Sequence, residues 1–146
     1  MLKIGHRGAC GYVAENTIES IEKAIELGVD GIEIDIFKCK SGELVLFHDQ
    51  TLSNLVGRPE KIEKLTLEEL SECLINNKYS IPTLKKVLEK FKTPLFVNIE
   101  LKGVDTAVST SNMLNKFISK EKWQESSFII SSFQWKELEK LREVNK

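Results

Sequence analysis

The pattern of apolar and polar residues over the first 36 positions predicts a strand, a helix and a second strand. Residues 2–5, with Leu2 and Ile4 on either side of Lys3, predict a short buried strand. Apolar residues then recur at helical spacing between Glu15-Asn16-Thr17, where Asn16 or Thr17 can cap a helix, and Gly28, which is typical of a helix end. Residues 31–36 alternate with period two, which predicts a strand with its three isoleucines on one face.

The next apolar run decides the topology of the sheet. Only residues 40–43 separate the second strand from residues 44–47, and a connection this short can join antiparallel strands but not parallel ones. We therefore expect residues 44–47 to form a hairpin with the second strand. With a two-residue Ser41-Gly42 turn, paired positions sum to 83 and His48 lies opposite Asp35, whereas a bulge would shift the pairing by one residue.

The rest of the chain predicts an irregular excursion over residues 51–63 and then alternating helices and strands. A capping box at Thr66-Leu67-Glu68-Glu69 begins a short helix, which we expect to end at Asn76-Asn77. The later elements are a helix that starts at Pro82-Thr83, a strand over 95–101, a helix over 105–120, a strand over 128–133 and a helix over 136–144.

These elements amount to an α/β chain with four parallel β/α units and one extra hairpin strand. A closed TIM-type (β/α) barrel has eight parallel strands and typically ~250 residues. The sequence has 146 residues, so we expect a single domain over 1–146 that corresponds to the first half of such a barrel and is incomplete at its C-terminal side. The open edges of this half are expected to pair with a second copy or with a complementing C-terminal half-barrel.

Composition narrows the class of protein. The chain carries a net charge of −1, with 41% hydrophobic and 29% charged residues, so we expect neither a nucleic-acid partner nor attraction to an anionic membrane. No apolar run approaches the ~20 residues of a membrane span. The first candidate site residue is His6, so we expect no signal peptide before it. The three cysteines form no CxxC pair. These features predict free thiols in a reducing, cytoplasmic location.

Ionisable residues lie at the ends of four of the predicted strands. A β/α barrel builds its active site from side chains at the C-terminal ends of successive strands. The set comprises two histidines, three carboxylates, one arginine and one lysine: His6, Arg7, Glu33, Asp35, His48, Glu100 and Lys102.

The carboxylates and histidines of this set suggest separate roles. Glu33 and Asp35 share one face of a strand, and Glu100 comes from the neighbouring strand. Because Mg²⁺ and Ca²⁺ prefer oxygen ligands, the three carboxylates predict a divalent metal site. His6 and His48 are candidates for a general acid and a general base, because imidazole can give or take a proton near neutral pH.

The two cations of the set suggest an anionic substrate. Arg7 and Lys102 have no acidic neighbour at helical spacing that would explain them. Arginine suits bidentate contact with phosphate, and lysine supplies a point charge. Together the seven residues predict metal-assisted attack on a phosphate ester.

These motifs have the order and approximate spacing of the glycerophosphodiester phosphodiesterase family, which the whole chain resembles. The segments that carry the resemblance are His6-Arg7-Gly8-Ala9, Glu15-Asn16-Thr17, Glu33-Ile34-Asp35, His48-Asp49, Pro82-Thr83-Leu84, Glu100-Leu101-Lys102 and Ser131-Ser132-Phe133. The chain departs from the family pattern at Ala14, where proline is usual, at Asn54, where a basic residue is common, and in the missing second half.

The resemblance implies a TIM barrel that hydrolyses glycerophosphodiesters to sn-glycerol 3-phosphate and an alcohol. It implies that Ca²⁺ or Mg²⁺ is bound by Glu33, Asp35 and Glu100. It implies that His6 and His48 are the acid/base pair and that Arg7 and Lys102 contact the phosphate. In the implied mechanism, one histidine activates the glycerol 2-hydroxyl to attack phosphorus and the other protonates the leaving alcohol. Water then opens the cyclic phosphate. We take His6 as the base and His48 as the acid, an order that the residues alone leave open.

Two other functions stay open at this stage. The chain could be a catalytically incompetent half-barrel that acts as a binding or assembly module. It could also be a related phosphodiesterase of the phospholipase D type, which cleaves sphingomyelin on a similar barrel. Its Arg7-Gly8 pair and its Glu15-Asn16-Thr17 helix start favour the glycerophosphodiester family instead.

Overall fold

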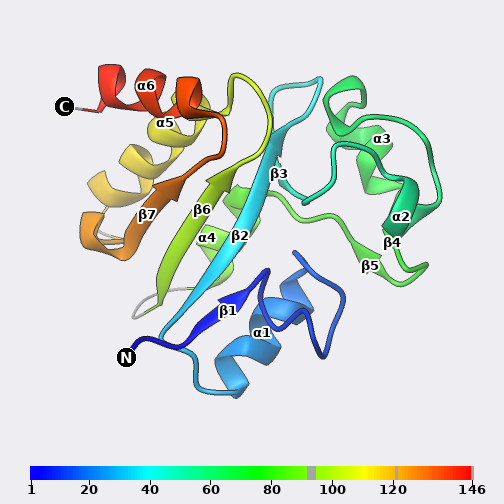
Figure 1. Ribbon diagram of the computed structural model, residues 1–146, viewed down its shortest axis with the longest axis horizontal. Coiled ribbons are helices and arrows are strands. Elements are labelled where there is room, and N and C mark those ends of the chain that lie inside the picture. The colour runs from blue at the N-terminus through cyan, green and yellow to red at the C-terminus, as the bar shows by residue number, and fades with distance from the viewer. Residues whose placement is uncertain (92–94, 121, 146) are drawn as a thin grey trace.

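The main sheet of the computed structural model, which describes residues 1–91, 95–120 and 122–145, has four parallel strands and one antiparallel strand (Figure 1). The parallel strands follow the order β1-β2-β6-β7, and β3 pairs with β2. The strand bounds are β1 (Ile4–His6), β2 (Gly31–Lys38), β3 (Leu44–Leu46), β6 (Phe96–Leu101) and β7 (Phe128–Ser131). The predicted four β/α units with an additional hairpin strand are confirmed.

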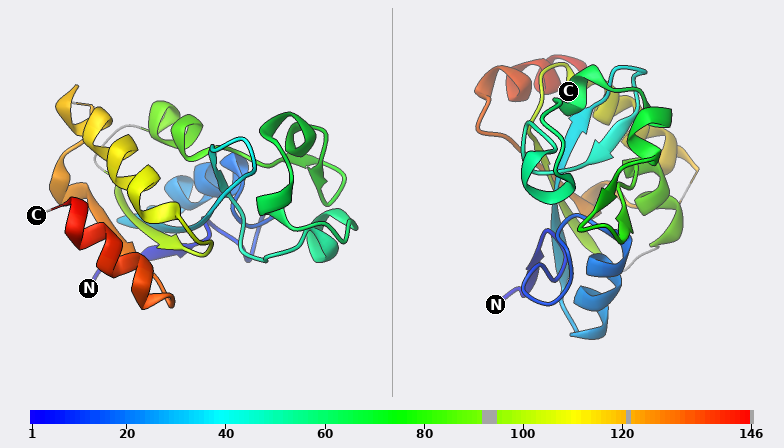
Figure 2. Two further views of the ribbon diagram at one scale, coloured as in Figure 1. Left: turned by 90° about the horizontal axis from the view of Figure 1, so that it is seen from above. Right: turned by 90° about the vertical axis from the view of Figure 1, so that its right-hand side faces the viewer.

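Four helices follow the parallel strands, which are α1 (Ile18–Glu26), α4 (Leu84–Lys90), α5 (Thr106–Ser119) and α6 (Trp135–Val144). Helices α1, α4 and α5 cover one face of the sheet, and α6 lies beside α5 next to β7 (Figure 2). The main core lies between this layer and the sheet, where the three alternating isoleucines of β2 are fully buried against residues of α1, α4 and α5. Thr17 caps α1, since its hydroxyl accepts a hydrogen bond from the backbone N–H of Ser20.

The other face of the sheet collects polar residues from neighbouring strands. In the parallel register of β2 and β6, Glu33 lies beside Asn98 and Asp35 lies beside Glu100. Side chains alternate along a strand, so these residues point away from the isoleucine face. The predicted common side for the three carboxylates is confirmed.

The hairpin between β2 and β3 has a register one residue away from the one that a two-residue turn predicts. Lys38 pairs with Leu44, so paired positions sum to 82, and the residue opposite Asp35 is Phe47 rather than His48. The strands are closed by a hydrogen bond from the backbone N–H of Cys39 to the Glu43 carbonyl (2.9 Å). Three residues therefore form the loop, and the positive φ of Gly42 (103°) is typical of such loops.

Residues between β3 and α4 form a small lobe with its own apolar core. Its elements are α2 (Ser53–Val56), the 3₁₀ helix η1 (Ile62–Lys64), α3 (Leu67–Ser71), β4 (Leu74–Ile75) and β5 (Tyr79–Ser80). The capping box of Thr66 and Glu69 is confirmed at the start of α3. The predicted end of this helix is wrong, because α3 stops at Ser71. Asn76 and Asn77, with φ of 51° and 56°, instead form the turn between β4 and β5, since asparagine tolerates positive φ.

No helix in the part of the chain that the structure describes is both long enough and apolar enough to cross a membrane.

Candidate active site

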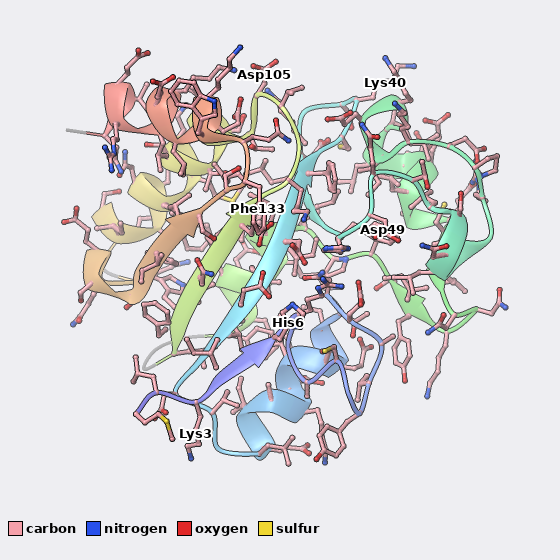
Figure 3. The ribbon with its side chains drawn as sticks, viewed as in Figure 1. Lys3, His6, Lys40, Asp49, Asp105 and Phe133 are labelled. Carbon is pink, nitrogen blue, oxygen red and sulfur yellow. The ribbon has the colours of Figure 1, made fainter. Side chains whose placement is uncertain are left out.

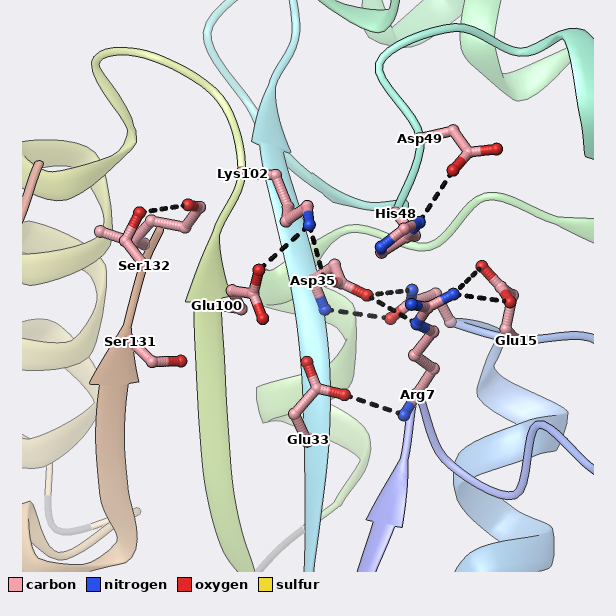
Figure 4. Close-up of polar contacts among 12 residues, drawn as sticks. Arg7, Glu15, Glu33, Asp35, His48, Asp49, Glu100, Lys102, Ser131 and Ser132 are labelled. Atoms are coloured by element: carbon pink, nitrogen blue, oxygen red, sulfur yellow. Dashed lines mark hydrogen bonds and ion pairs between the residues drawn. The ribbon is translucent and has the colours of Figure 1, made fainter. Parts of the chain in front are cut away.

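The structure brings the predicted site residues together along the polar face of the sheet, from the C-terminal ends of β1 and β6, the middle of β2 and the segment after β3 (Figures 3 and 4). Glu33, Asp35 and Glu100 form its centre: one oxygen from each carboxylate lies within 4.8 Å of the others. Their side chains are largely buried, with 13%, 2% and 17% exposed. Three converging oxygen donors are the ligand set that Ca²⁺ or Mg²⁺ prefers.

The electrostatics of this cluster also fit a cation. Burial, followed by the charge of Asp35, raises the pKa of Glu33 from 4.5 to about 7, and Glu100 adds to the rise. Burial raises the pKa of Asp35 as well, although hydrogen bonding by Asn16 and nearby positive charges oppose the shift. Crowded, buried carboxylates that resist ionisation are stabilised by a divalent cation. The residues present therefore fit the metal that the donor set suggests.

Arg7 and Lys102 lie on either side of the carboxylate cluster (Figure 4). The Arg7 Nη1 atom donates to both carboxylate oxygens of Glu15 at 3.0 Å, and its Nε atom lies 3.3 Å from Asp35 Oδ2. The Lys102 Nζ atom lies 3.0 Å from Glu100 Oε1 and 3.9 Å from Asp35 Oδ1. Two cationic groups are therefore available next to the acidic centre, where a phosphoryl group would need them.

The backbone at Arg7 is held in a rarely used conformation. Arg7 has a φ of 51° and Gly8 a φ of 81°, and a Cβ at Gly8 would lie 2.2 Å from Ser20 Oγ. Ser20 Oγ donates to the Arg7 carbonyl at 2.7 Å and the Asn16 N–H donates to it at 3.0 Å. This turn points the Arg7 N–H at Glu33 Oε2, 3.1 Å away. Backbone strain of this kind clusters at functional sites.

The two histidines occupy different environments. His48 Nδ1 lies 2.8 Å from Asp49 Oδ1, and Asn54 Nδ2 donates to the other oxygen of Asp49 at 2.7 Å. Asp49 therefore fixes the ring of His48 and leaves Nε2 available for proton transfer. His6 is 63% exposed, and its Nε2 lies 3.9 Å from Glu33 Oε2.

The sequence analysis missed three residues that support the candidate site, because it treated them only as parts of local motifs. Glu15 orients Arg7, Asp49 orients His48, and Asn16 hydrogen-bonds Asp35. Asn16 and Thr17 were considered as alternative caps, and Thr17 alone caps the helix. Thr17 is sufficient to cap the helix, so the two polar residues before it, Glu15 and Asn16, needed another explanation. That was the signal that could have identified them as site residues.

Comparisons with known proteins agree with the family resemblance of the sequence. Residues 6–146 match the glycerophosphoryl diester phosphodiesterase family. A glycerophosphodiester phosphodiesterase from Caldanaerobacter subterraneus is 38% identical over 141 residues, which cover 90% of this chain and 58% of that protein. The crystal structure of a glycerophosphodiester phosphodiesterase from Thermotoga maritima is 33% identical, with a TM-score of 0.78, and the match covers 100% of this chain and 60% of that one.

A third relative was solved with a bound product. The structure of an Oleispira antarctica phosphodiesterase in complex with the product sn-glycerol-3-phosphate is 27% identical, with a TM-score of 0.81, and the match covers 97% of this chain and 61% of that one. The chain thus spans about 60% of the length of these relatives. Its parallel sheet and helices are the corresponding part of their TIM-type barrel, as the sequence predicted. Since the family match spans residues 6–146, nearly the whole chain, the protein belongs to the glycerophosphoryl diester phosphodiesterase family.

Proposed function

We propose that this chain carries the catalytic residues of a metal-dependent glycerophosphodiester phosphodiesterase, which releases sn-glycerol 3-phosphate and an alcohol. The observation that carries the proposal is the convergence of Glu33, Asp35 and Glu100 within 4.8 Å, flanked by Arg7 and Lys102. A phosphodiester is negatively charged, and charge on its oxygens rises as phosphorus is attacked. Buried carboxylates beside a substrate of this charge require a bound cation between them.

Each part of the site has a role in this proposal. The three carboxylates would hold Ca²⁺ or Mg²⁺, which offsets charge on the phosphoryl oxygens when bound. Arg7 and Lys102 bind the phosphoryl oxygens and orient phosphorus. Glu15 holds the Arg7 guanidinium through two hydrogen bonds, so the position of this cation is set before substrate binds.

The histidines carry the protons. His6 accepts the proton of the glycerol 2-hydroxyl as that oxygen attacks phosphorus, and His48 donates a proton to the alcohol oxygen as its bond to phosphorus breaks. This step leaves a cyclic phosphate and a free alcohol. In the second step His48 accepts a proton from the attacking water, and His6 returns its proton to the 2-oxygen as the ring opens. Asp49 holds the His48 ring for both transfers.

The comparisons support the proposed substrate class, and the cysteines support the proposed location. The Oleispira antarctica relative was solved with the product sn-glycerol-3-phosphate, which favours the same product here. All three cysteines are free thiols, and two are buried. Free thiols are typical of a reducing compartment, so we place the activity in the cytoplasm.

A second candidate function is a half-barrel that binds metal without turnover. It is favoured by the fact that the chain spans about 60% of its relatives and that the described residues contribute four parallel strands. Such a chain would gain activity only with a second copy or with a complementing C-terminal half-barrel.

The test is release of sn-glycerol 3-phosphate from glycerophosphocholine by the purified chain, with Ca²⁺, with Mg²⁺ and after metal removal. We expect metal-dependent release that His6→Ala and His48→Ala each lower by roughly 10²- to 10⁴-fold. Gln124→Ala, at an exposed position in a loop, is the control and should leave the rate unchanged.

Three results would change the conclusion. A chain that binds metal but releases no product favours the second candidate. A chain that fails to bind Ca²⁺ or Mg²⁺ contradicts the metal site. Release that persists in both histidine variants contradicts acid/base catalysis by these residues.

A further inference from the structure

A second cavity is lined by residues of α4 and α5. These helices lie on the helical face of the sheet, opposite the polar face that carries the active site (Figure 2). Its volume is about 420 Å³, compared with about 290 Å³ for the cavity beside His48 and Lys102. Gly42 and Leu44 of the β2–β3 hairpin contribute to it from the sheet. A volume of this size falls in the usual range of small-molecule sites.

One stripe of α5 supplies much of the wall. The lining residues of this helix are spaced so that they share one side of it: Ser109, Asn112, Met113 and Lys116. Two neighbouring helices on a sheet normally bury apolar residues against each other at such positions. Here the facing side of α5 is mainly polar, and a cavity separates it from α4.

The lining is strongly cationic. It contains four lysines and one glutamate, which are Lys85, Lys116, Lys120, Lys122 and Glu89. Lys85 lies 3.8 Å from Glu89, and among the described residues none of the other three lysines forms an ion pair. The described residues of the lining thus carry a charge of about +3 in a chain whose net charge is −1. Like charges gathered around a cavity repel each other, and a bound anion relieves that repulsion.

The inner part of the cavity is apolar. Leu44 is 1% exposed and Phe117 is 9% exposed, and Met113 packs against the same core. Ser109 and Asn112 add groups that can donate hydrogen bonds. The cavity therefore combines a cationic rim with an apolar floor.

We propose that this cavity binds a small organic phosphate, with the phosphate group among the lysines and an apolar group on the floor formed by Leu44, Met113 and Phe117. A phosphate monoester carries nearly two negative charges at neutral pH, which matches several lysines better than a single carboxylate would. The site is separate from the carboxylate cluster and independent of the proposed hydrolysis.

Calorimetric titration of the metal-free chain, prepared on a chelating resin, tests the proposal. The probes are hexyl phosphate, adenosine monophosphate, inorganic phosphate and hexanol. We expect one molecule of an organic phosphate to bind each chain at least tenfold more tightly than inorganic phosphate or hexanol. Binding should weaken severalfold as salt rises from about 0.02 to about 0.2 M, since screening reduces the attraction. Tighter binding of hexyl phosphate would indicate a lipid-like ligand, and tighter binding of adenosine monophosphate would indicate a nucleotide.

Matched variants locate the binding. Lys85→Gln with Lys116→Gln should weaken the organic phosphate at least tenfold. Lys61→Gln with Lys136→Gln, which removes two exposed lysines outside the cavity, should leave the affinity unchanged. Met113→Ala should weaken hexyl phosphate severalfold without affecting inorganic phosphate. Circular dichroism confirms that each variant is folded.

Several results would overturn the proposal. One is equal affinity for hexyl phosphate and inorganic phosphate. Another is unchanged binding in the Lys85 and Lys116 double variant. Loss of binding in Arg7→Gln would also overturn it, because the phosphate would then occupy the active site.

Discussion

Asn16 supports the most buried carboxylate of the site through two hydrogen bonds. Its Nδ2 donates to Asp35 Oδ2 at 3.0 Å, and its Oδ1 accepts from the Asp35 backbone N–H at 3.1 Å. The residue is 1% exposed and has a φ of 54°. In the proposed reaction Asn16 is thus a positioning residue, which acts through Asp35.

We expect Asn16→Gly to lower the affinity for Ca²⁺ or Mg²⁺ and kcat/KM by about 10- to 100-fold, as loss of a group behind a metal ligand usually does. Glycine keeps the positive φ, so the variant removes the side chain without backbone strain. Asn77→Gly is the control, since Asn77 has a similar φ of 56° in the turn between β4 and β5. Metal titration and kinetics measure the two variants. Equal behaviour of both would contradict the positioning role.

Glu33 gives the metal-free protein a distinct pH dependence. The pKa of this residue rises from 4.5 to about 7 on folding, so the folded protein binds the proton more tightly than the unfolded chain does. The stability that this contributes is fully present below about pH 4.5 and is lost as pH rises through about 7. The full effect is of the order of 3 kcal/mol.

Thermal unfolding should therefore show Tm of the metal-free chain falling by several degrees between about pH 5 and about pH 7.5. Added Mg²⁺ or Ca²⁺ should raise Tm more at the higher pH, because the metal binds the ionised carboxylates. Glu33→Gln should flatten the dependence in the metal-free protein. The same slope with and without the Glu33 carboxyl group would refute this explanation.

At the scale of elements, α5 is capped by a residue from another helix. Glu137 of α6 is 2% exposed, and its carboxylate accepts hydrogen bonds from the backbone N–H groups of Asp105, Thr106 and Ala107 at 3.0–3.2 Å. Burial alone would raise the pKa of Glu137, but the hydrogen bonds from Lys140 and from these N–H groups lower it. The contact connects α6 to the start of α5.

Glu137→Gln should lower the free energy of unfolding by about 2–4 kcal/mol. The glutamine NH₂ group cannot accept these hydrogen bonds, so buried N–H groups lose partners. Glu139→Gln, at an exposed position on the same helix, should change stability by less than ~0.5 kcal/mol. Urea denaturation monitored by fluorescence measures both variants. A loss in Glu137→Gln no larger than in Glu139→Gln would show that the capping contact contributes little.

Most elements of the main sheet could be predicted from the sequence, whereas two contacts between elements could not. The strands and helices of the sheet followed from local periodicity, and the site followed from polar residues at strand ends. The hairpin register depended on the length of the loop, and the sequence allowed both two and three residues. The three-residue loop that forms has Gly42 in a left-handed conformation. The cap by Glu137 joins residues about 30 positions apart and has no local signal in the sequence.

At the scale of the whole molecule, the sheet is open at β1 and β7. These strands lie at the two ends of the parallel order, so each has one side without a partner strand among the described residues. Large apolar residues in or beside these strands are exposed, which are Leu2, Ile4, Ile129, Phe133 and Trp135. Unpaired strand edges flanked by apolar side chains favour pairing with another chain.

We therefore expect the chain to self-associate through these edges at micromolar concentration. Ile129 is 52% exposed on the edge strand β7, so Ile129→Lys should shift the sedimentation profile towards monomer, because pairing would bury the new charge. Leu74→Lys, at a 43% exposed position in β4 of the small lobe, should leave the profile unchanged. If the second copy also completes the active site, specific activity should rise with chain concentration and fall in Ile129→Lys. A chain that stays monomeric across this range, with constant specific activity, would show that its exposed edges do not drive association and that any catalysis needs no partner.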